Sequence, residues 1–140
     1  ILLEQAIIGR EIEAAVLGND SPEVAATLGE IIPSREFYSY EAKYVDPNGA
    51  SLKIPAEIEA NVANRIRDLA VESFRIVEGL GMARVDFFLT KDNQIYINEI
   101  NTLPGFTSIS MYPKLWEASG LSYSELLHQL VLLGLQRAAV

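Results

Sequence analysis

The chain has 140 residues, the size of one domain, and 49% of them are apolar, which is enough for a packed core. It has no cysteine, which excludes a disulfide scaffold and thiolate metal sites and agrees with a cytoplasmic protein. The net charge of −8 argues against nucleic acid as a partner but does not oppose metal ions, and no apolar run reaches the ~20 residues that a membrane-spanning helix needs.

The first segment, Leu2 to Leu17, alternates polar and apolar residues around Gly9. This pattern predicts two strands that break at the glycine. In the second strand Glu11, Glu13 and Ala15 would lie on one face, with apolar residues on the other. Because the chain starts inside this alternation and without Met, we expect it to be a piece of a longer protein.

A turn is expected at 18–22, and Gly29 to Pro33 is a short candidate strand. The next segment, Ser34 to Ala56, carries several aromatic residues among charges and has little periodicity. We interpret it as a long connection containing a turn at 46–49. Such a connection is either a surface excursion or a functional loop.

Pro55 is expected to open a helix with one buried stripe, formed by Ile58, Val62, Ile66, Leu69, Ser73 and Val77. A left-handed cap at Gly79 or Gly81 would end this helix.

A β-hairpin follows, ending in the sequence IYINEIN. A loop of two residues, Asp92 and Asn93, or of four places Thr90 opposite Ile95 and Phe88 opposite Ile97. Further along the hairpin, the same register pairs Asp86 with Glu99 and Arg84 with Asn101. A loop of three or five residues would shift this register by one.

Two carboxylates that face each other on one sheet repel, so either Arg84 neutralises them or a cation lies between them. Oxygen ligands from Asp86, Glu99 and Asn101 suit magnesium. After the hairpin, Gly105 frees backbone N–H groups to approach a ligand, and hydroxyl side chains follow it.

Two short helices are expected at the C-terminal end. Pro113 suits the first turn of one that runs to about Ser119, and Ser122 with Glu125 has capping-box spacing before a last helix that ends near Arg137. The predicted fold class is therefore α+β, with a mainly antiparallel sheet flanked by helices.

The segment GMARVDFFLTKDNQIYINEINTLPGFTS closely resembles the C-terminal signature of D-alanine–D-alanine ligases, members of the ATP-grasp superfamily. LEQAIIGREIEAAVLG resembles the adenine- and ribose-binding stretch of the same enzymes, and YSYEAKY resembles their mobile loop. The resemblance spans essentially the whole chain, with its motifs in the same order. It implies that residues 1–140 form the C-terminal ATP-grasp domain.

For the nucleotide, the resemblance implies that Glu4 lies beside the adenine and that the backbone around Ala6 and Ile7 recognises the edge of the base. Glu11 would accept hydrogen bonds from the ribose hydroxyls, and Lys43 would reach the terminal phosphate.

For the metal, it implies that Asp86, Glu99 and Asn101 hold two Mg²⁺ ions, or Mn²⁺, that bridge the ATP phosphates.

For the amino-acid substrates, the resemblance implies that Arg84 and the Gly105 amide form an oxyanion hole. Ser110 and the Met111 amide would hold the carboxylate of the second D-alanine, and Tyr44 would help to close the loop over the site. The implied reaction phosphorylates one D-alanine and joins it to a second, a step in peptidoglycan precursor synthesis.

The implied partners are ATP, D-alanine, and an N-terminal domain and central subdomain of the parent chain, which is compatible with a homodimer. We expect the 140 residues alone to be inactive and to bind nucleotide weakly. The alternatives are another ATP-grasp carboxylate–amine or D-alanine–D-lactate ligase, a non-catalytic nucleotide- or metal-binding module, and an acidic interaction domain.

Overall fold

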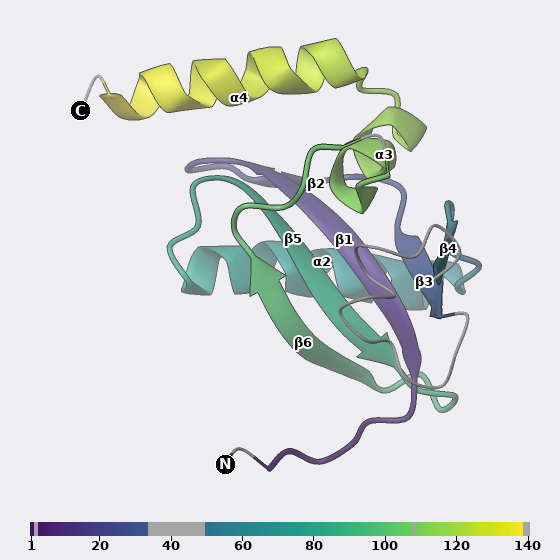
Figure 1. Ribbon diagram of the computed structural model, residues 1–140. Coiled ribbons are helices and arrows are strands. Elements are labelled where there is room, and N and C mark those ends of the chain that lie inside the picture. Colours follow the sequence, from purple (N-terminus) through teal and green to yellow (C-terminus); the bar gives the residue numbers. More distant parts are fainter. Residues whose placement is uncertain (2, 34–49, 108, 139–140) are drawn as a thin grey trace.

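The fold is built on one antiparallel sheet (Figure 1). The computed structural model describes residues 1, 3–33, 50–107 and 109–138. The strands are β1 (Arg10–Gly18), β2 (Glu23–Val24), β3 (Gly29–Pro33), β4 (Ala50–Lys53), β5 (Gly81–Leu89) and β6 (Ile95–Asn101). The helices are α2 (Ala60–Ile76), α3 (Met111–Ala118) and α4 (Tyr123–Ala138). The strand order is β4-β3-β1-β5-β6, with β2 paired to β1, and every ladder among these strands is antiparallel, which confirms the predicted α+β class.

One face of the sheet is covered by α2. Its buried residues Val62, Ile66 and Phe74 join the apolar residues of β1 and β5 in one core cluster. Of the predicted stripe, Val62, Ile66 and Ser73 are buried, whereas Val77 is 49% exposed and lies beyond the last turn. The alternation predicted for β1 is confirmed, because Ile12 belongs to this cluster.

On the opposite face, α3 and α4 are the described elements that give cover, and they lie at one end (Figure 1). There Ala15 of β1 packs with Tyr112, Leu115 and Trp116 of α3 and with Leu126 of α4. The covered end of β1 is thus its apolar end. The other end of the same face carries Glu11 and Glu13, so the sequence itself separates a packed half from a polar half.

The C-terminal helices agree with the prediction. Pro113 lies in the first turn of α3, and the N–H of Ser122 and that of Glu125 each donate to the other residue's side chain, at 3.1 and 3.3 Å, as a capping box requires. Several large apolar residues of α4 are exposed, among them Leu127, Val131 and Leu135. Among the described helices, none is long and apolar enough to cross a membrane.

Three boundaries were predicted wrongly. Residues 3–8 form no strand, and β1 starts at Arg10, where its ladder with β5 begins. Pro55 does not open α2, because the N–H of Ala56 donates to the carbonyl of Leu28 at 2.8 Å and the helix begins only at Ala60. The expected long connection contains β4, which pairs with β3, while its remaining residues 34–49 lie outside the described part of the chain.

The end of α2 also differs from the prediction. The left-handed residue that ends the helix is Glu78, with φ of 54°, and not Gly79 or Gly81, although Gly81, the first residue of β5, also has a positive φ of 78°. The N–H of Gly79 donates to the carbonyl of Phe74 and the N–H of Glu78 donates to that of Arg75, at 2.8 and 3.0 Å. This is a Schellman motif in which a glutamate occupies the position that glycine prefers.

We therefore predict that Glu78→Gly raises the free energy of unfolding by about 0.5–1 kcal/mol, because glycine adopts the left-handed conformation without a Cβ penalty. The matched control is Glu72→Gly, an exposed site inside α2, where the same change is expected to cost about 1 kcal/mol. Urea unfolding of both variants measures the two effects. Equal losses would contradict this account of the helix end.

Candidate functional site

A row of three carboxylates crosses the polar half of the sheet. Glu13 on β1 lies directly opposite Asp86 on β5, and Asp86 lies directly opposite Glu99 on β6. Adjacent strands are about 4.8 Å apart, so the three side chains lie close enough to repel strongly. Asp86 is fully buried and Glu13 is 4% exposed, whereas the Glu99 side chain is 52% exposed.

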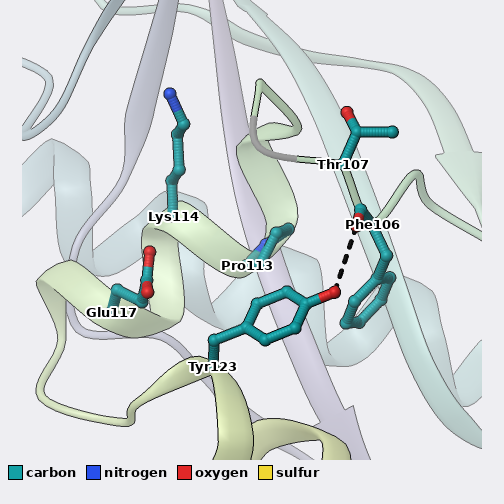
Figure 2. Close-up of a pocket in the computed structure, with 6 residues that line it drawn as sticks. All are labelled: Phe106, Thr107, Pro113, Lys114, Glu117 and Tyr123. Carbon is teal, nitrogen blue, oxygen red and sulfur yellow. Dashed lines mark hydrogen bonds between the residues drawn. The ribbon is translucent and has the colours of Figure 1, made fainter.

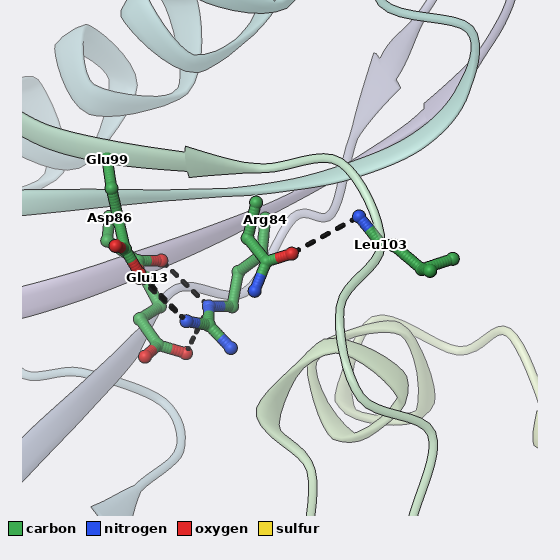
Figure 3. Close-up of polar contacts among 6 residues, drawn as sticks. Glu13, Arg84, Asp86, Glu99 and Leu103 are labelled. Carbon is green, nitrogen blue, oxygen red and sulfur yellow. Dashed lines mark hydrogen bonds and ion pairs between the residues drawn. The ribbon is translucent and has the colours of Figure 1, made fainter. Parts of the chain in front are cut away.

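Arg84 offsets part of the negative charge of these three carboxylates (Figure 3). Its Nε and Nη2 donate to the two carboxylate oxygens of Asp86, both at 2.7 Å. Its Nε lies 3.1 Å from Oε2 of Glu13, and its Nη2 lies 3.7 Å from Oε1 of Glu99. One guanidinium therefore faces all three acids.

The carboxylates around Arg84 favour its charged form. Burial disfavours the charged form, but the hydrogen bonds to Asp86 and the negative charges of Glu13, Asp86 and Glu99 outweigh it and raise the pKa of Arg84 above its ordinary value. Counting these four groups as ionised, three negative charges face one positive charge. Within this group of four, the negative charge exceeds the positive charge, which favours the approach of a cation.

The pairing predicted for Asp86 with Glu99 and for Arg84 with Asn101 is confirmed. The pairing predicted nearer the loop is wrong, because Phe88 lies opposite Tyr96 and Leu89 opposite Ile95.

Two features explain this difference. The hairpin loop, residues 90–94, is five residues long, and its Asn93 is left-handed with φ of 57°. This loop shifts the register by one, and a bulge at Asn98, between the pairs Phe87–Ile97 and Asp86–Glu99, shifts it back.

Two explanations were given for the facing acids, neutralisation by Arg84 and a cation between them. In the described structure Arg84 contacts both Asp86 and Glu99, as the first of these two alternatives expected. The donor set is nevertheless the kind that magnesium takes, carboxylate and amide oxygens without nitrogen or sulfur ligands. Asn101 is the third predicted ligand, and its Oδ1 accepts a hydrogen bond from the N–H of Leu103 at 3.2 Å.

Glu13 was not predicted as a site residue. Carboxylate oxygens of Glu11, Glu13 and Asp86 lie within 4.8 Å of one another. The signal available in the sequence was an acidic residue two positions after Glu11, in a strand whose other residues become buried. It pointed to the correct face, but only the long-range ladder between β1 and β5 brings Glu13 to Asp86.

The loop after β6 brings three more predicted residues together. A Cβ at Gly105 would lie 2.9 Å from Oγ of Ser110, so only glycine lets the backbone come this close. The Ser110 hydroxyl accepts from the N–H of Thr107 at 2.9 Å, and Ser110 is the N-cap of α3. Met111 is the first residue of α3, where backbone N–H groups have no partner within the helix and favour an anion.

A surface pocket of about 360 Å³ lies beside this loop, between α3 and α4 (Figure 2). Tyr123 donates its hydroxyl to the carbonyl of Phe106 at 3.1 Å, and the two rings lie 6.1 Å apart. Lys114 and Glu117 also line it. Among the predicted site residues that the structure describes, none lines this pocket, and its aromatic contacts attach the Gly105 loop to the helices.

The remaining predicted residues lie elsewhere. Glu4, Ala6 and Ile7 belong to the irregular segment before β1, at the N-terminal end in Figure 1, and Glu4 and Ala6 are exposed. Lys43 and Tyr44 lie outside the described residues.

Known proteins match nearly the whole chain. A family model described as the D-ala D-ala ligase C-terminus matches residues 1–132. The D-alanine–D-alanine ligase of Oceanobacillus iheyensis is 59% identical over 137 residues, which cover 98% of this chain and 37% of that protein. This chain therefore spans little more than a third of that relative's length.

Solved structures match as well. A D-alanine–D-alanine ligase from Coxiella burnetii superposes with a TM-score of 0.82 at 46% identity, covering 96% of this chain and 34% of that one. A D-alanine–D-alanine ligase from Bacillus anthracis, complexed with ATP, has a TM-score of 0.74 at 30% identity, covering 95% of this chain and 42% of that one.

The charge balance of the site generates a prediction. Arg84→Met removes the guanidinium that contacts buried Asp86 and Glu13, which should lower the free energy of unfolding at pH 7 by about 3–5 kcal/mol. Millimolar Mg²⁺ should restore part of this loss, because a divalent ion replaces the missing charge. Thermal unfolding with and without Mg²⁺ measures both effects.

The matched control is Arg10→Met. Arg10 makes an equally short two-point contact with a single carboxylate, Glu30, at 2.7 Å for each bond. Its loss should not be restored by Mg²⁺. Equal rescue of both variants would mean that the ion stabilises the protein without binding at the carboxylate row.

Proposed function

Because this chain belongs to the D-alanine–D-alanine ligase family, we propose that it is the C-terminal, ATP- and magnesium-binding domain of an ATP-dependent D-alanine–D-alanine ligase. The observation that carries the proposal is the placement of Asp86 and Glu99 on one face of the sheet around Arg84. An N-terminal domain and a central subdomain would make up the rest of the enzyme.

Magnesium would be held by Asp86, Glu99 and Asn101, and when bound it would neutralise negative charge on the ATP phosphates. The three carboxylates that contact Arg84 support this assignment, since their negative charge favours the binding of a divalent cation. Asp86 would fix the position of the ion from the buried side, and exposed Glu99 would close on it from the solvent side.

The nucleotide would lie along the polar half of the sheet. Glu11, two residues before Glu13 on the same face of β1, would accept hydrogen bonds from the ribose. Glu4 and the backbone of Ala6 and Ile7 would contact the adenine, and Lys43 would reach the terminal phosphate.

The chemistry assigned to the chain is acyl transfer after phosphorylation of the first D-alanine. As the amine of the second D-alanine attacks the acyl phosphate, negative charge develops on the carbonyl oxygen. Arg84 and the Gly105 amide would stabilise it by about 3 kcal/mol per donor.

Ser110, the Met111 amide and the start of α3 would bind the carboxylate of the second D-alanine, which the helix terminus favours. Tyr44 would help to close the site and exclude water.

The test of the metal assignment is Glu99→Gln in the full-length parent enzyme. Removing the charge of a metal ligand should slow formation of the acyl phosphate by about 100-fold, measured as rapid-quench release of ADP with saturating ATP, Mg²⁺ and D-alanine. Because Glu99 is half-exposed, the unfolding temperature should stay near that of the wild type.

The matched control is Glu72→Gln, an exposed glutamate on α2, on the other face of the sheet. It should leave the rate unchanged. A wild-type rate in Glu99→Gln would show that this carboxylate does not serve the phosphoryl step. Comparing D-alanine with D-lactate as the second substrate distinguishes an amine from a hydroxyl nucleophile.

A further prediction concerns the 140 residues alone. Supplied with ATP, Mg²⁺ and D-alanine, they should release no phosphate above background, because they span only 37% of a ligase from the same family. A colorimetric phosphate assay measures this, with the full-length parent as the positive control. Steady turnover by the short chain would contradict the need for the other domains.

A further inference from the structure

Arg84 and a bound metal would compete for the same carboxylate. Both oxygens of Asp86 accept hydrogen bonds from Arg84, at 2.7 Å each. In the proposed function Asp86 holds magnesium while Arg84 receives the oxyanion. With a divalent ion held by Asp86, the attraction between Asp86 and the Arg84 guanidinium would be weaker, and the two cations would repel each other. Another anionic group must therefore keep Arg84 in place.

Glu13 meets the requirements for that group. Its Oε2 lies 3.1 Å from Nε of Arg84, and its side chain is 5% exposed. In Figure 3 the carboxylates of Glu13 and Asp86 both point toward the Arg84 guanidinium, from two neighbouring strands. Opposite Glu13 on its other side is Gly29, where a Cβ would lie 2.4 Å from Sδ of Met111, so α3 closes over this flank.

The same facts argue against Glu13 as a metal ligand. Magnesium in a phosphate site is usually bound through one or two carboxylates and completes its coordination with water and phosphate oxygens. Asp86 and the half-exposed Glu99 already supply two carboxylates. Glu13 lies on the far side of Asp86 from Glu99 in the row, away from its half-exposed end.

We propose that Glu13 is a positioning residue for Arg84. It holds the guanidinium in place while Asp86 and Glu99 bind the metal, so that Arg84 stays available to the developing oxyanion. This inference rests on the proposed function, since it needs a metal at Asp86 and an oxyanion at Arg84.

The test is Glu13→Gln in the full-length parent, which keeps the size of the side chain and removes its charge. We expect kcat to fall by about 10- to 100-fold, the usual effect of losing an outer-shell partner, with KM for ATP nearly unchanged. Mn²⁺ binding, followed by electron paramagnetic resonance with a non-hydrolysable ATP analogue, should be unaltered. In Glu13→Gln with Mg²⁺ and the analogue added, the Nε–H proton of Arg84 should exchange with water faster than in the wild type. Nuclear magnetic resonance of the arginine side chain measures this exchange.

Two further variants separate the outcomes. Glu13→Asp keeps the charge at a shorter reach and should recover part of kcat, which also covers the case in which Glu13→Gln folds poorly. In Glu99→Gln, Mn²⁺ binding should weaken by about 10-fold or more while the Arg84 signal stays protected.

The proposal is overturned if Glu13→Gln weakens Mn²⁺ binding as strongly as Glu99→Gln, which would make Glu13 a ligand. It is also overturned if kcat and the Arg84 signal are both unchanged, or if Glu13→Asp recovers nothing. If Glu99→Gln leaves Mn²⁺ binding intact, the proposed metal site itself is wrong, whatever Glu13 does.

Discussion

The contact between Arg84 and Asp86 is the interaction on which the polar half of the sheet depends. Asp86 is fully buried, and a buried carboxylate is tolerated only when it is paired and hydrogen-bonded. Arg84 supplies both hydrogen bonds, and it is in turn surrounded by Glu13 and Glu99. Any ligand that takes charge from Asp86 therefore changes the balance of all four groups at once.

The sheet can hold this charge because its two faces are built differently. Toward α2, β1 contributes Ile12, Ala14 and Val16 to a continuous apolar core, so the position of the strand does not depend on the acids. On the other face, α3 and α4 cover only the end of β1 near Ala15. The carboxylate row thus rests on a well-packed support while one of its members stays open to solvent.

The sequence predicted the parts of this arrangement that follow from local rules. Alternation along a strand placed Glu11 and Glu13 on one face, and the α+β class followed from the order of the elements. The pairing of Asp86 with Glu99 was correct although the loop was not, because the five-residue loop and the bulge at Asn98 shift the register in opposite directions. Neither shift has a clear signal in the sequence.

What the sequence could not give was the neighbour of Asp86 on its other side. A hairpin partner is close in the chain, whereas Glu13 reaches Asp86 only through a ladder between distant strands, which alternation does not specify.

With Glu13 as the second neighbour of Asp86, the three carboxylates of the row have different roles. Asp86 and Glu13 are buried, so their carboxylates have fixed positions. Glu99 is half-exposed, so its side chain can adjust to a bound ligand. A cluster of acids in a chain of net charge −8 attracts cations, and Arg84 offsets part of the repulsion among the three carboxylates that it contacts.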